Sequence, residues 1–98
     1  MIEIKEPKQF QWDHGNERKS PDKHKVSREE TEQVFFNQPL LLLEDKAHSQ
    51  KEMRFHALGR TDNNRKLHIT FTIRINIIRV ISARPMHNKE RKSYEKNS

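Results

Sequence analysis

Six side chains, three histidines and three arginines, are those with which this sequence could do chemistry: His24, His56, His68, Arg60, Arg74 and Arg84. An imidazole titrates near neutral pH, so it can accept or donate a proton. A guanidinium group binds two phosphate oxygens at once. Such groups suit metal-free cleavage of an RNA phosphodiester, because RNA carries its own nucleophile, the 2′-OH, and needs only a base, an acid and fixed cations. An arginine taken singly is more often a solvated charge at a strand end, and the functional interpretation rests on several of them in one small sheet.

Other common kinds of site are not indicated by the residue spacing. The chain has six histidines, and none pairs at the HxH or HExxH spacing that places two imidazoles on one ion. Its two glycines are too few for a glycine-rich phosphate loop, and no nucleophile elbow is present. We therefore expect no metal site and no cofactor.

The positive charge is concentrated in the C-terminal part of the chain. Residues 1–59 carry 10 Lys and Arg against 11 Asp and Glu, a net charge of −1. Residues 60–98 carry 10 against 3, a net charge of +7. A basic half of this kind favours a polyanionic partner, with nucleic acid first. The alternative is a surface that charge merely keeps soluble.

Length and composition indicate one small domain. The chain has 98 residues, of which 31% are apolar and 35% charged, so its core must be lean. It has no cysteine, which fits a reducing compartment. No apolar run approaches the roughly 18 residues of a membrane span, and the first residues do not form a signal peptide. We expect a cytoplasmic protein with no membrane partner.

The strongest structural pattern covers residues 65–84. Apolar and polar residues alternate from Lys66 to Arg74, which is typical of a strand with one buried face. From Ile78 to Arg84 apolar residues fall on both phases, which predicts a strand covered on both sides. We interpret the two segments as the central hairpin of an antiparallel sheet.

The N-terminal half predicts helices and one short strand. Residues 1–9 form a flexible lead-in, and residues 10–12 alternate as a very short strand at a sheet edge. Asp13 can cap a helix from Asn16 to about Lys19. Ser27 and Glu30 stand at capping-box spacing and begin a helix from Arg28 to Phe36, which buries Val34 and either Phe35 or Phe36.

Further strands and a last helix complete the predicted domain. Residues 40–43 suggest a buried strand, residues 53–60 alternate as another strand, and residues 61–64 form a tight turn. Met86 and Tyr94 share one side of a basic helix that they could dock. The fold class is therefore α+β, with an antiparallel sheet of about four main strands, two N-terminal helices and one C-terminal helix in a single domain over residues 10–98.

An ordered series of motifs carries a family resemblance. The motifs are Phe10-Gln11-Trp12-Asp13 with Asn16, Lys23-His24-Lys25-Val26-Ser27, Glu32-x-Val34-Phe35, Arg54, Leu58-Gly59-Arg60-Thr61, Phe71-Thr72-x-Arg74, Ile78-Arg79-Val80-Ile81-Ser82-Ala83-Arg84, and Glu90 with Tyr94. Over residues 10–95 the sequence resembles the BrnT-type toxin family. The Ile-Ser-Ala-Arg segment is the most specific piece, and the order of the whole set carries the resemblance.

The resemblance implies a fold, an activity and partners. The fold would be similar to RelE-type toxins, and the activity would be that of a ribonuclease toxin that cleaves RNA and stops translation and growth. A dimeric DNA-binding antitoxin would neutralise it, with a toxin dimer possible in the complex. The alternative is a non-catalytic basic module that binds nucleic acid or an acidic protein.

The resemblance implies site residues at Lys23, His24, Arg60, Arg74 and Arg84, and together with the charge pattern it leads us to assign three sets. The catalytic set is His24, Arg60, Arg74 and Arg84, with the proton carrier left open. The RNA-binding set is Lys23, Lys25, Arg65, Arg79 and Arg91. The antitoxin-binding set is Met86 and Tyr94. Three departures from the family pattern concern the first helix, the hairpin turn and the start of the last helix: Ser20-Pro21-Asp22, Ile75-Asn76-Ile77, and Pro85 with His87.

Overall fold

The computed structural model of the chain describes residues 9–12, 25–48 and 52–97. Its elements along the chain are β1 Gln9–Gln11, α2 Arg28–Val34, β2 Leu41–Asp45, the 3-10 turn η1 Lys46–His48, β3 Arg54–Arg60, β4 Lys66–Arg74, β5 Ile77–Pro85 and α3 Asn88–Lys96. The helix predicted over residues 16–19 and nearly all of the predicted lead-in lie outside the described residues.

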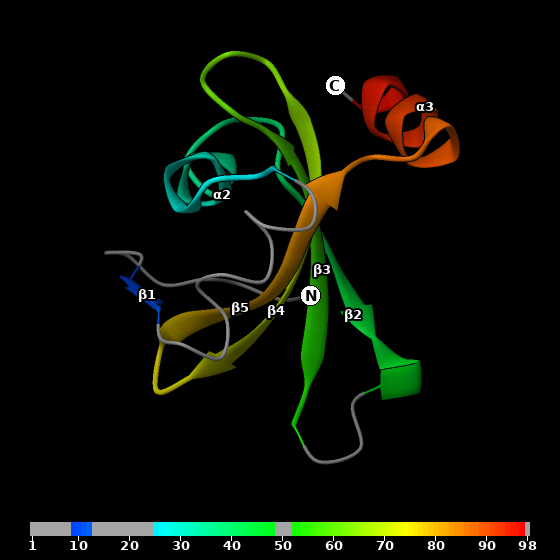
Figure 1. Cartoon of the computed structure of the whole chain (residues 1–98). Coiled ribbons are helices and arrows are strands. Elements are labelled where there is room, and N and C mark those ends of the chain that lie inside the picture. The colour runs from blue at the N-terminus through cyan, green and yellow to red at the C-terminus, as the bar shows by residue number, and fades with distance from the viewer. Residues whose placement is uncertain (1–8, 13–24, 49–51, 98) are drawn as a thin grey trace.

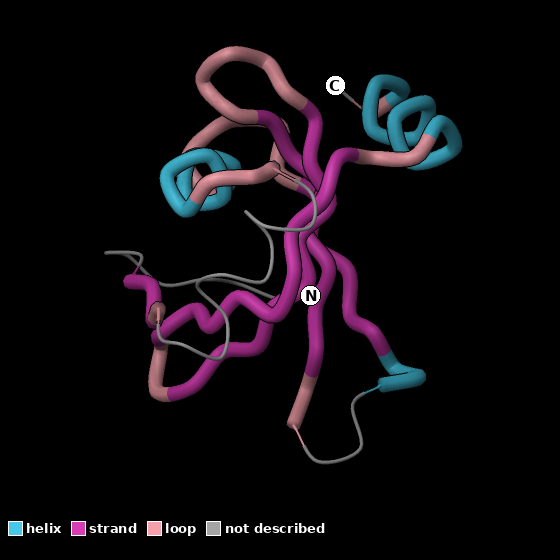
Figure 2. Tube along the Cα trace, viewed as in Figure 1, coloured by secondary structure: helices cyan, strands magenta, loops and turns pink. Residues whose placement is uncertain are grey.

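One five-stranded sheet, in the order β1-β5-β4-β3-β2, forms the centre of the molecule. The four longer strands are antiparallel neighbours, as predicted, and β1 is the short edge strand expected over residues 10–12. Because β1 pairs in parallel with β5, the sheet is mixed, which corrects the purely antiparallel prediction. The α+β class is confirmed. Figure 1 shows α2 and α3 on opposite sides of the sheet, and Figure 2 shows the strands of the sheet running between the two helices.

The central hairpin of β4 and β5 is present, but its second strand differs from the prediction. On β4, Leu67, Ile69 and Phe71 are fully buried on one face. The register shifts between Thr70, opposite Ser82, and Phe71, opposite Val80, so β5 carries one extra residue there. This bulge returns the apolar residues of β5 to the core face. The two apolar phases therefore come from a bulge and not from coverage of the strand on both sides.

The turn of this hairpin has no glycine. Ile75 and Asn76 both have positive φ, at 51° and 64°, as a tight two-residue hairpin turn requires. A β-branched residue rarely adopts this conformation. Ile75 is 93% exposed, so its side chain takes no part in the fold of the described residues.

The main core lies between α2 and the sheet. Ser27 caps α2 as predicted, because its hydroxyl accepts from the Glu30 amide at 3.1 Å and the Glu30 carboxylate accepts from the Ser27 amide at 3.0 Å. The helix ends at Val34, and Phe35 rather than Phe36 turns inward, with its ring centroid 5.2 Å from that of Phe71. Gly59 lets α2 approach, since a Cβ there would lie 2.6 Å from Val34.

The strand predicted over residues 40–43 is an edge strand. It forms as β2, but it lies at the end of the sheet and Leu43 is 55% exposed, so the expected burial is wrong. The strand predicted over residues 53–60 and the turn over residues 61–64 are confirmed as β3 and a loop. In that loop the Asn64 amide donates to the Thr61 carbonyl.

A small second core lies on the opposite face of the sheet, under α3. Leu58, Met86 and Tyr94 are buried there, with Leu41 packed against them. The Tyr94 hydroxyl donates to the Pro39 carbonyl at 2.7 Å. Both predicted docking residues therefore fix α3 to its own sheet. Neither described helix is long and apolar enough to span a membrane.

Candidate active site

The sheet face under α3 gathers the polar residues of the central strands. Alternation along β3 and β4 places His56 and His68 on this face, away from the main core. The strand register aligns His68 with Arg84 on one side and with Leu58 on the other, and it aligns His56 with Thr70 in the next row. Two of the three candidate histidines and one of the three candidate arginines are thus neighbours.

His56 is held on both ring nitrogens. Its Nε2 lies 3.0 Å from Asp45 Oδ2, and its Nδ1 lies 3.1 Å from Thr70 Oγ1. A carboxylate only accepts hydrogen bonds, so the Nε2 of His56 carries a proton. Asp45 and Thr70 therefore fix the orientation of this ring.

His68 is the more buried imidazole of the two and is neutral at neutral pH. Its ring centroid lies 4.7 Å from that of His56, and its side chain is only 12% exposed. Burial, with help from the charge of Arg84, lowers the pKa of His68 from 6.5 to about 4. Its Nε2 lies 3.9 Å from Glu90 Oε2, which is too far for a hydrogen bond. At neutral pH this imidazole can accept a proton.

Arg84 forms a two-pronged ion pair with Glu90 of α3. Its Nη1 and Nη2 donate to the two carboxylate oxygens at 2.8 and 2.9 Å. The same carboxylate accepts from the His87 amide at 2.9 Å, which closes the first turn of α3. The hydrogen bond from Arg84 lowers the pKa of Glu90 to about 2. The pair thus joins the start of α3 to the sheet beside His68.

A pocket of about 450 Å³ opens beside this cluster. Its lining residues come from β2, β3, β4 and α3: Leu43, His56, Leu58, His68, Lys89, Glu90 and Ser93. The neutral imidazole of His68 and the ammonium group of Lys89 line the pocket, and the guanidinium of Arg84 lies next to His68. These are a proton acceptor and the cations that a phosphodiester needs.

Arg74 and Arg79 lie far from this pocket. Arg74 ends β4, six residues from His68, so it is about 20 Å along the strand from the row that holds Arg84. It pairs with Glu52 through both Nε and Nη2. Arg79 stands opposite Thr72, near the same end of the hairpin. Arg74 and Arg84 therefore cannot hold one phosphate together.

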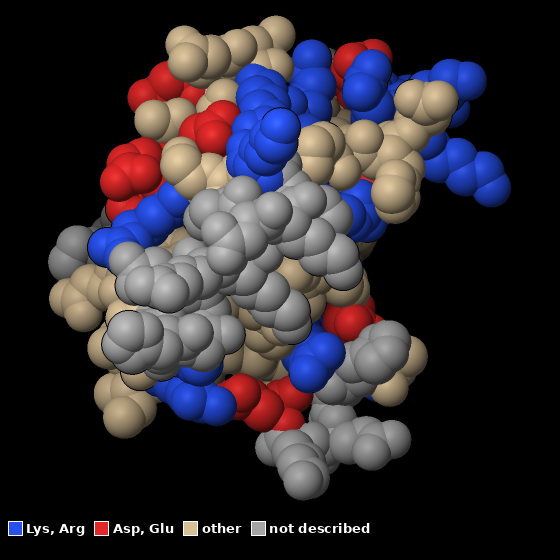
Figure 3. All heavy atoms as spheres, in the orientation of Figure 1, with Lys and Arg blue, Asp and Glu red and all other residues tan. Residues whose placement is uncertain are grey.

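Two further predicted residues, Arg60 and Arg91, lie at the end of β3 and on α3. Arg60 ends β3 and donates from Nε to the Gln38 carbonyl at 2.8 Å. Arg91 is exposed on α3. Lys and Arg atoms are dense around α3 in Figure 3, whereas Asp and Glu atoms gather over α2. A basic surface thus borders the pocket.

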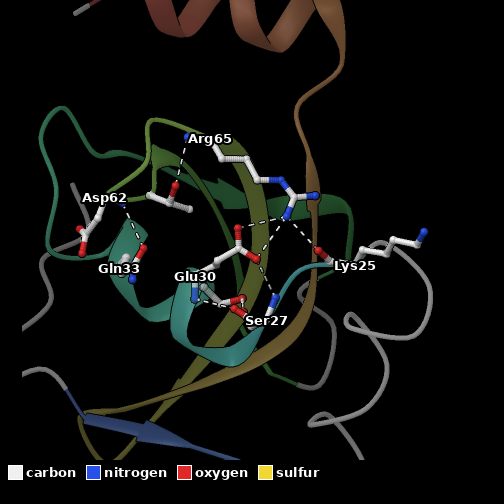
Figure 4. A network of polar contacts seen from close by, with 8 residues as sticks. Lys25, Ser27, Glu30, Gln33, Asp62 and Arg65 are labelled. Carbon is white, nitrogen blue, oxygen red and sulfur yellow. Dashed lines mark hydrogen bonds and ion pairs between the residues drawn. The ribbon is translucent and has the colours of Figure 1, made fainter.

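Arg65 has a structural role, because its guanidinium binds groups at the start of α2. Its Nη1 donates to the Lys25 carbonyl at 2.8 Å and lies 3.1 to 3.2 Å from the Glu30 carboxylate oxygens. Its amide donates to Thr61. Figure 4 shows this guanidinium between the Lys25 carbonyl and the start of α2. Lys25 has a positive φ of 54°, so Arg65 fixes a strained residue.

Four other predicted site residues have different outcomes. Lys23 and His24 lie outside the described residues. Met86 and Tyr94 are buried, with exposed fractions of 5% and 1%, and belong to the second core. Their side chains are not presented to a partner, and antitoxin contact by them stays a prediction.

The sequence reasoning missed two acids, Asp45 and Glu90, as parts of this site. It named His56 and His68 as possible proton carriers but did not pair them. A signal was available, because both lie on the polar phase of consecutive antiparallel strands. Within the described residues, no three His, Asp or Glu side chains form a group that could hold a metal ion.

The fold and the pocket define a small α+β protein with a candidate phosphodiester site beside a basic helix. Comparison with protein families gives a more specific result. The family described as "Ribonuclease toxin, BrnT, of type II toxin-antitoxin system" matches residues 12–90, so the chain belongs to this family. It is a ribonuclease toxin of a type II toxin–antitoxin system, with RNA as substrate and an antitoxin as partner. Among curated proteins, no relative matches the chain.

Proposed function

We propose that the chain is a metal-independent endoribonuclease whose scissile phosphate binds in the pocket under α3. The observation that carries this is the position of His68, a neutral imidazole that lies in one pocket with Lys89 and next to Arg84. Of the predicted catalytic residues, Arg84 is the one that lies next to His68 in the proposed active site. His24 stays a candidate outside the described residues.

In the proposed reaction, His68 removes the proton from the 2′-OH of the substrate. The oxygen attacks the adjacent phosphorus, and the bond to the 5′ oxygen of the next nucleotide breaks. Arg84 stabilises the charge on the phosphate, because its five N–H donors can hold Glu90 and a phosphate oxygen together. The departing 5′ oxygen takes a proton from solvent beside the Lys89 ammonium and leaves as a 5′-OH, and His68 then releases the proton that it accepted to solvent. His56, fixed by Asp45 and Thr70, positions the His68 ring.

The products would be a 2′,3′-cyclic phosphate and a 5′-OH end. No metal ion is required in this scheme, since the nucleophile is already part of the substrate. Placing His68 next to a bound phosphate would raise its pKa, because the negative charge favours the imidazolium ion. The pKa of His68, which is about 4 in the free chain, would therefore rise toward neutral pH when the substrate binds.

In the cell, such an activity would act in the cytoplasm on mRNA and arrest translation and growth. A DNA-binding antitoxin would suppress it, and two toxin copies in one complex with an antitoxin dimer would be consistent with that role. These statements extend the family assignment to this chain as proposals.

Purified chain incubated with a long single-stranded RNA tests the proposal. We expect cleavage in the presence of EDTA, with product ends that carry a cyclic or 3′ phosphate. Loss of activity in EDTA and its return with magnesium would contradict the mechanism. RNA that is bound but never cut would favour the non-catalytic basic module instead.

A further inference from the structure

The outer edge of β2 is a strand edge without a strand beside it among the described residues. β2 is the last strand of the sheet order, and β3 pairs with its inner side over Leu41–Asp45. An unpaired edge presents backbone N–H and C=O groups to any extended chain that approaches. The outward backbone groups along Leu41–Glu44 could therefore accept one more strand.

An apolar groove of about 440 Å³ runs beside this edge. It lies between β2 and the outer side of α3, and its lining residues are Leu40, Leu41, Leu42, Leu43, Leu58, Ser93 and Asn97. Leu43 is 55% exposed, although it sits in the middle of a strand. An open strand edge next to apolar pockets is the arrangement with which proteins bind an extended peptide as an added strand.

We propose that an extended apolar segment of the antitoxin, followed by acidic residues, pairs with β2 and lies in the groove beside α3. This inference rests on the proposed function, because it takes the antitoxin as the partner. In this proposal Leu43 takes the place of Met86 and Tyr94 as the apolar residue that the antitoxin contacts, because Leu43 is exposed and the other two are buried.

The charge and size of the surface favour this occupant. α3, whose Ser93 and Asn97 line the groove, also carries the exposed lysines Lys89, Lys92 and Lys96. Acidic residues that follow the added strand would lie against these lysines. A five-residue strand alone does not reach the roughly 800 Å² per partner of a standard interface. The segment must therefore continue from β2 over α3.

A second copy of the chain fits the edge less well. Antiparallel self-pairing centred on Leu43 would place Leu41 opposite Asp45 and Leu42 opposite Glu44, so leucines would face carboxylates. Pairing centred on Leu42 would bring Pro39, which has no N–H, opposite Asp45. Only three leucines would then pair with one another. An antitoxin segment has no such constraint.

Binding in the groove would also close the candidate active site. Leu43, Leu58 and Ser93 line both the groove and the pocket that holds His68. A strand seated beside Leu43 therefore covers the pocket entrance. The antitoxin would inhibit by occupying this edge, without covering Arg74 at the other end of the hairpin.

The test compares two substitutions of equally exposed apolar residues, Leu43→Asp and Met53→Asp. Met53 is 50% exposed and is not among the residues that line the groove. The probe is the purified product of the neighbouring small open reading frame, whose affinity for each folded variant is measured by calorimetry. We expect Leu43→Asp to weaken binding about tenfold or more and Met53→Asp to leave it unchanged. In hydrogen exchange, the amides of β2 should gain protection in the wild-type complex.

The other outcomes overturn the proposal in distinguishable ways. Equal affinity of the two variants, with β2 amides unprotected, would refute the docking site while the antitoxin partnership stands. Dimerisation of the free chain that Leu43→Asp abolishes would make a second copy the occupant. No binding of the probe by the wild-type chain would remove the partner itself, whereas RNA cleavage by the free chain is assayed separately.

Discussion

The two faces of the sheet are built for different tasks. The face under α2 is covered by a contiguous apolar core, which includes Val34, Phe35 and Phe71 at exposed fractions of 1% or less. Of the residues that the structure describes, the cluster under α3 buries three apolar ones, and a partly open pocket lies beside it. Since one face supplies most of the burial, the other can hold histidines, an arginine and their acids close together.

Polar residues behave differently on the two faces. Around α2, Arg65 links the Lys25 carbonyl to the Glu30 carboxylate. The indole N–H of Trp12 donates to the Glu32 carboxylate of α2 at 2.7 Å, so this hydrogen bond also belongs to the fold around α2. Around α3, the neutral His68 lies beside a pocket. A cation near α2 is thus part of the fold, and one near the pocket is a candidate for the site.

The largest expected effect is on the α2 face. Phe71→Ala should reduce the free energy of unfolding by about 3–5 kcal/mol, because it opens a cavity among buried rings. Denaturant unfolding monitored by circular dichroism measures this loss. Phe36→Ala, at a ring that is 57% exposed, is the matched control and should change stability far less. Equal effects of the two would mean that the main core is not where the structure places it.

On the α3 face, His68→Gln should act on catalysis. Removing a proton acceptor should slow RNA cleavage about 10²- to 10⁴-fold, while the melting temperature stays close to that of wild type. His87→Gln, an exposed histidine at the start of α3, is the control and should cut normally. If His68→Gln cleaves at the wild-type rate, this histidine is structural and the pocket is not the active site.

Two arginines that both pair with a glutamate sharpen the comparison further. Arg84→Ala should slow cleavage about 10²- to 10³-fold, since it removes a cation from the developing charge. Arg74→Ala lies at the far end of the hairpin and should change the rate little. Its half-exposed pair with Glu52 contributes under about 1 kcal/mol to stability. A single-turnover assay separates the two, and a strong defect in Arg74→Ala alone would move the site to the hairpin tip.

The last expected effect is a pH dependence of stability. The folded chain holds the pKa of His68 at about 4, below its ordinary 6.5, so the unfolded state binds the proton first. Stability is therefore full above pH 6.5 and falls as the pH drops toward 4. His68→Gln should remove this loss in denaturant titrations. Glu90, with a pKa of about 2, loses its contribution only below its ordinary 4.5. An identical profile in the variant would contradict the burial of His68.

Much of the local structure could be predicted from the sequence. The capping box of α2, the alternation on β3 and β4, and the turn over residues 61–64 depend on neighbours within a few residues. The family resemblance was likewise a property of ordered motifs, and residues 12–90 match that family. The mixed sheet could not be predicted, because the three residues of β1 carry no signal for the direction in which they pair.

Charge counting shows what a linear view leaves out. The sequence placed a net charge of +7 on residues 60–98 and so favoured a polyanionic partner for that half. In the folded chain Arg65 pairs with Glu30 and Arg74 pairs with Glu52, and both acids come from the other half. Which arginine stands beside a pocket depends on these long-range partners.

The sequence by itself determined the fold class, the family, most strands and the caps, because these depend on residue types at short, fixed spacings. Only the tertiary structure decided which candidates meet. Register aligned His68 with Arg84, a bulge in β5 returned its apolar residues to one face, and the docking of α3 brought Glu90 to the site while it buried Met86 and Tyr94. Contacts between residues so far apart follow from strand pairing and helix packing, and neither is encoded in any single local pattern.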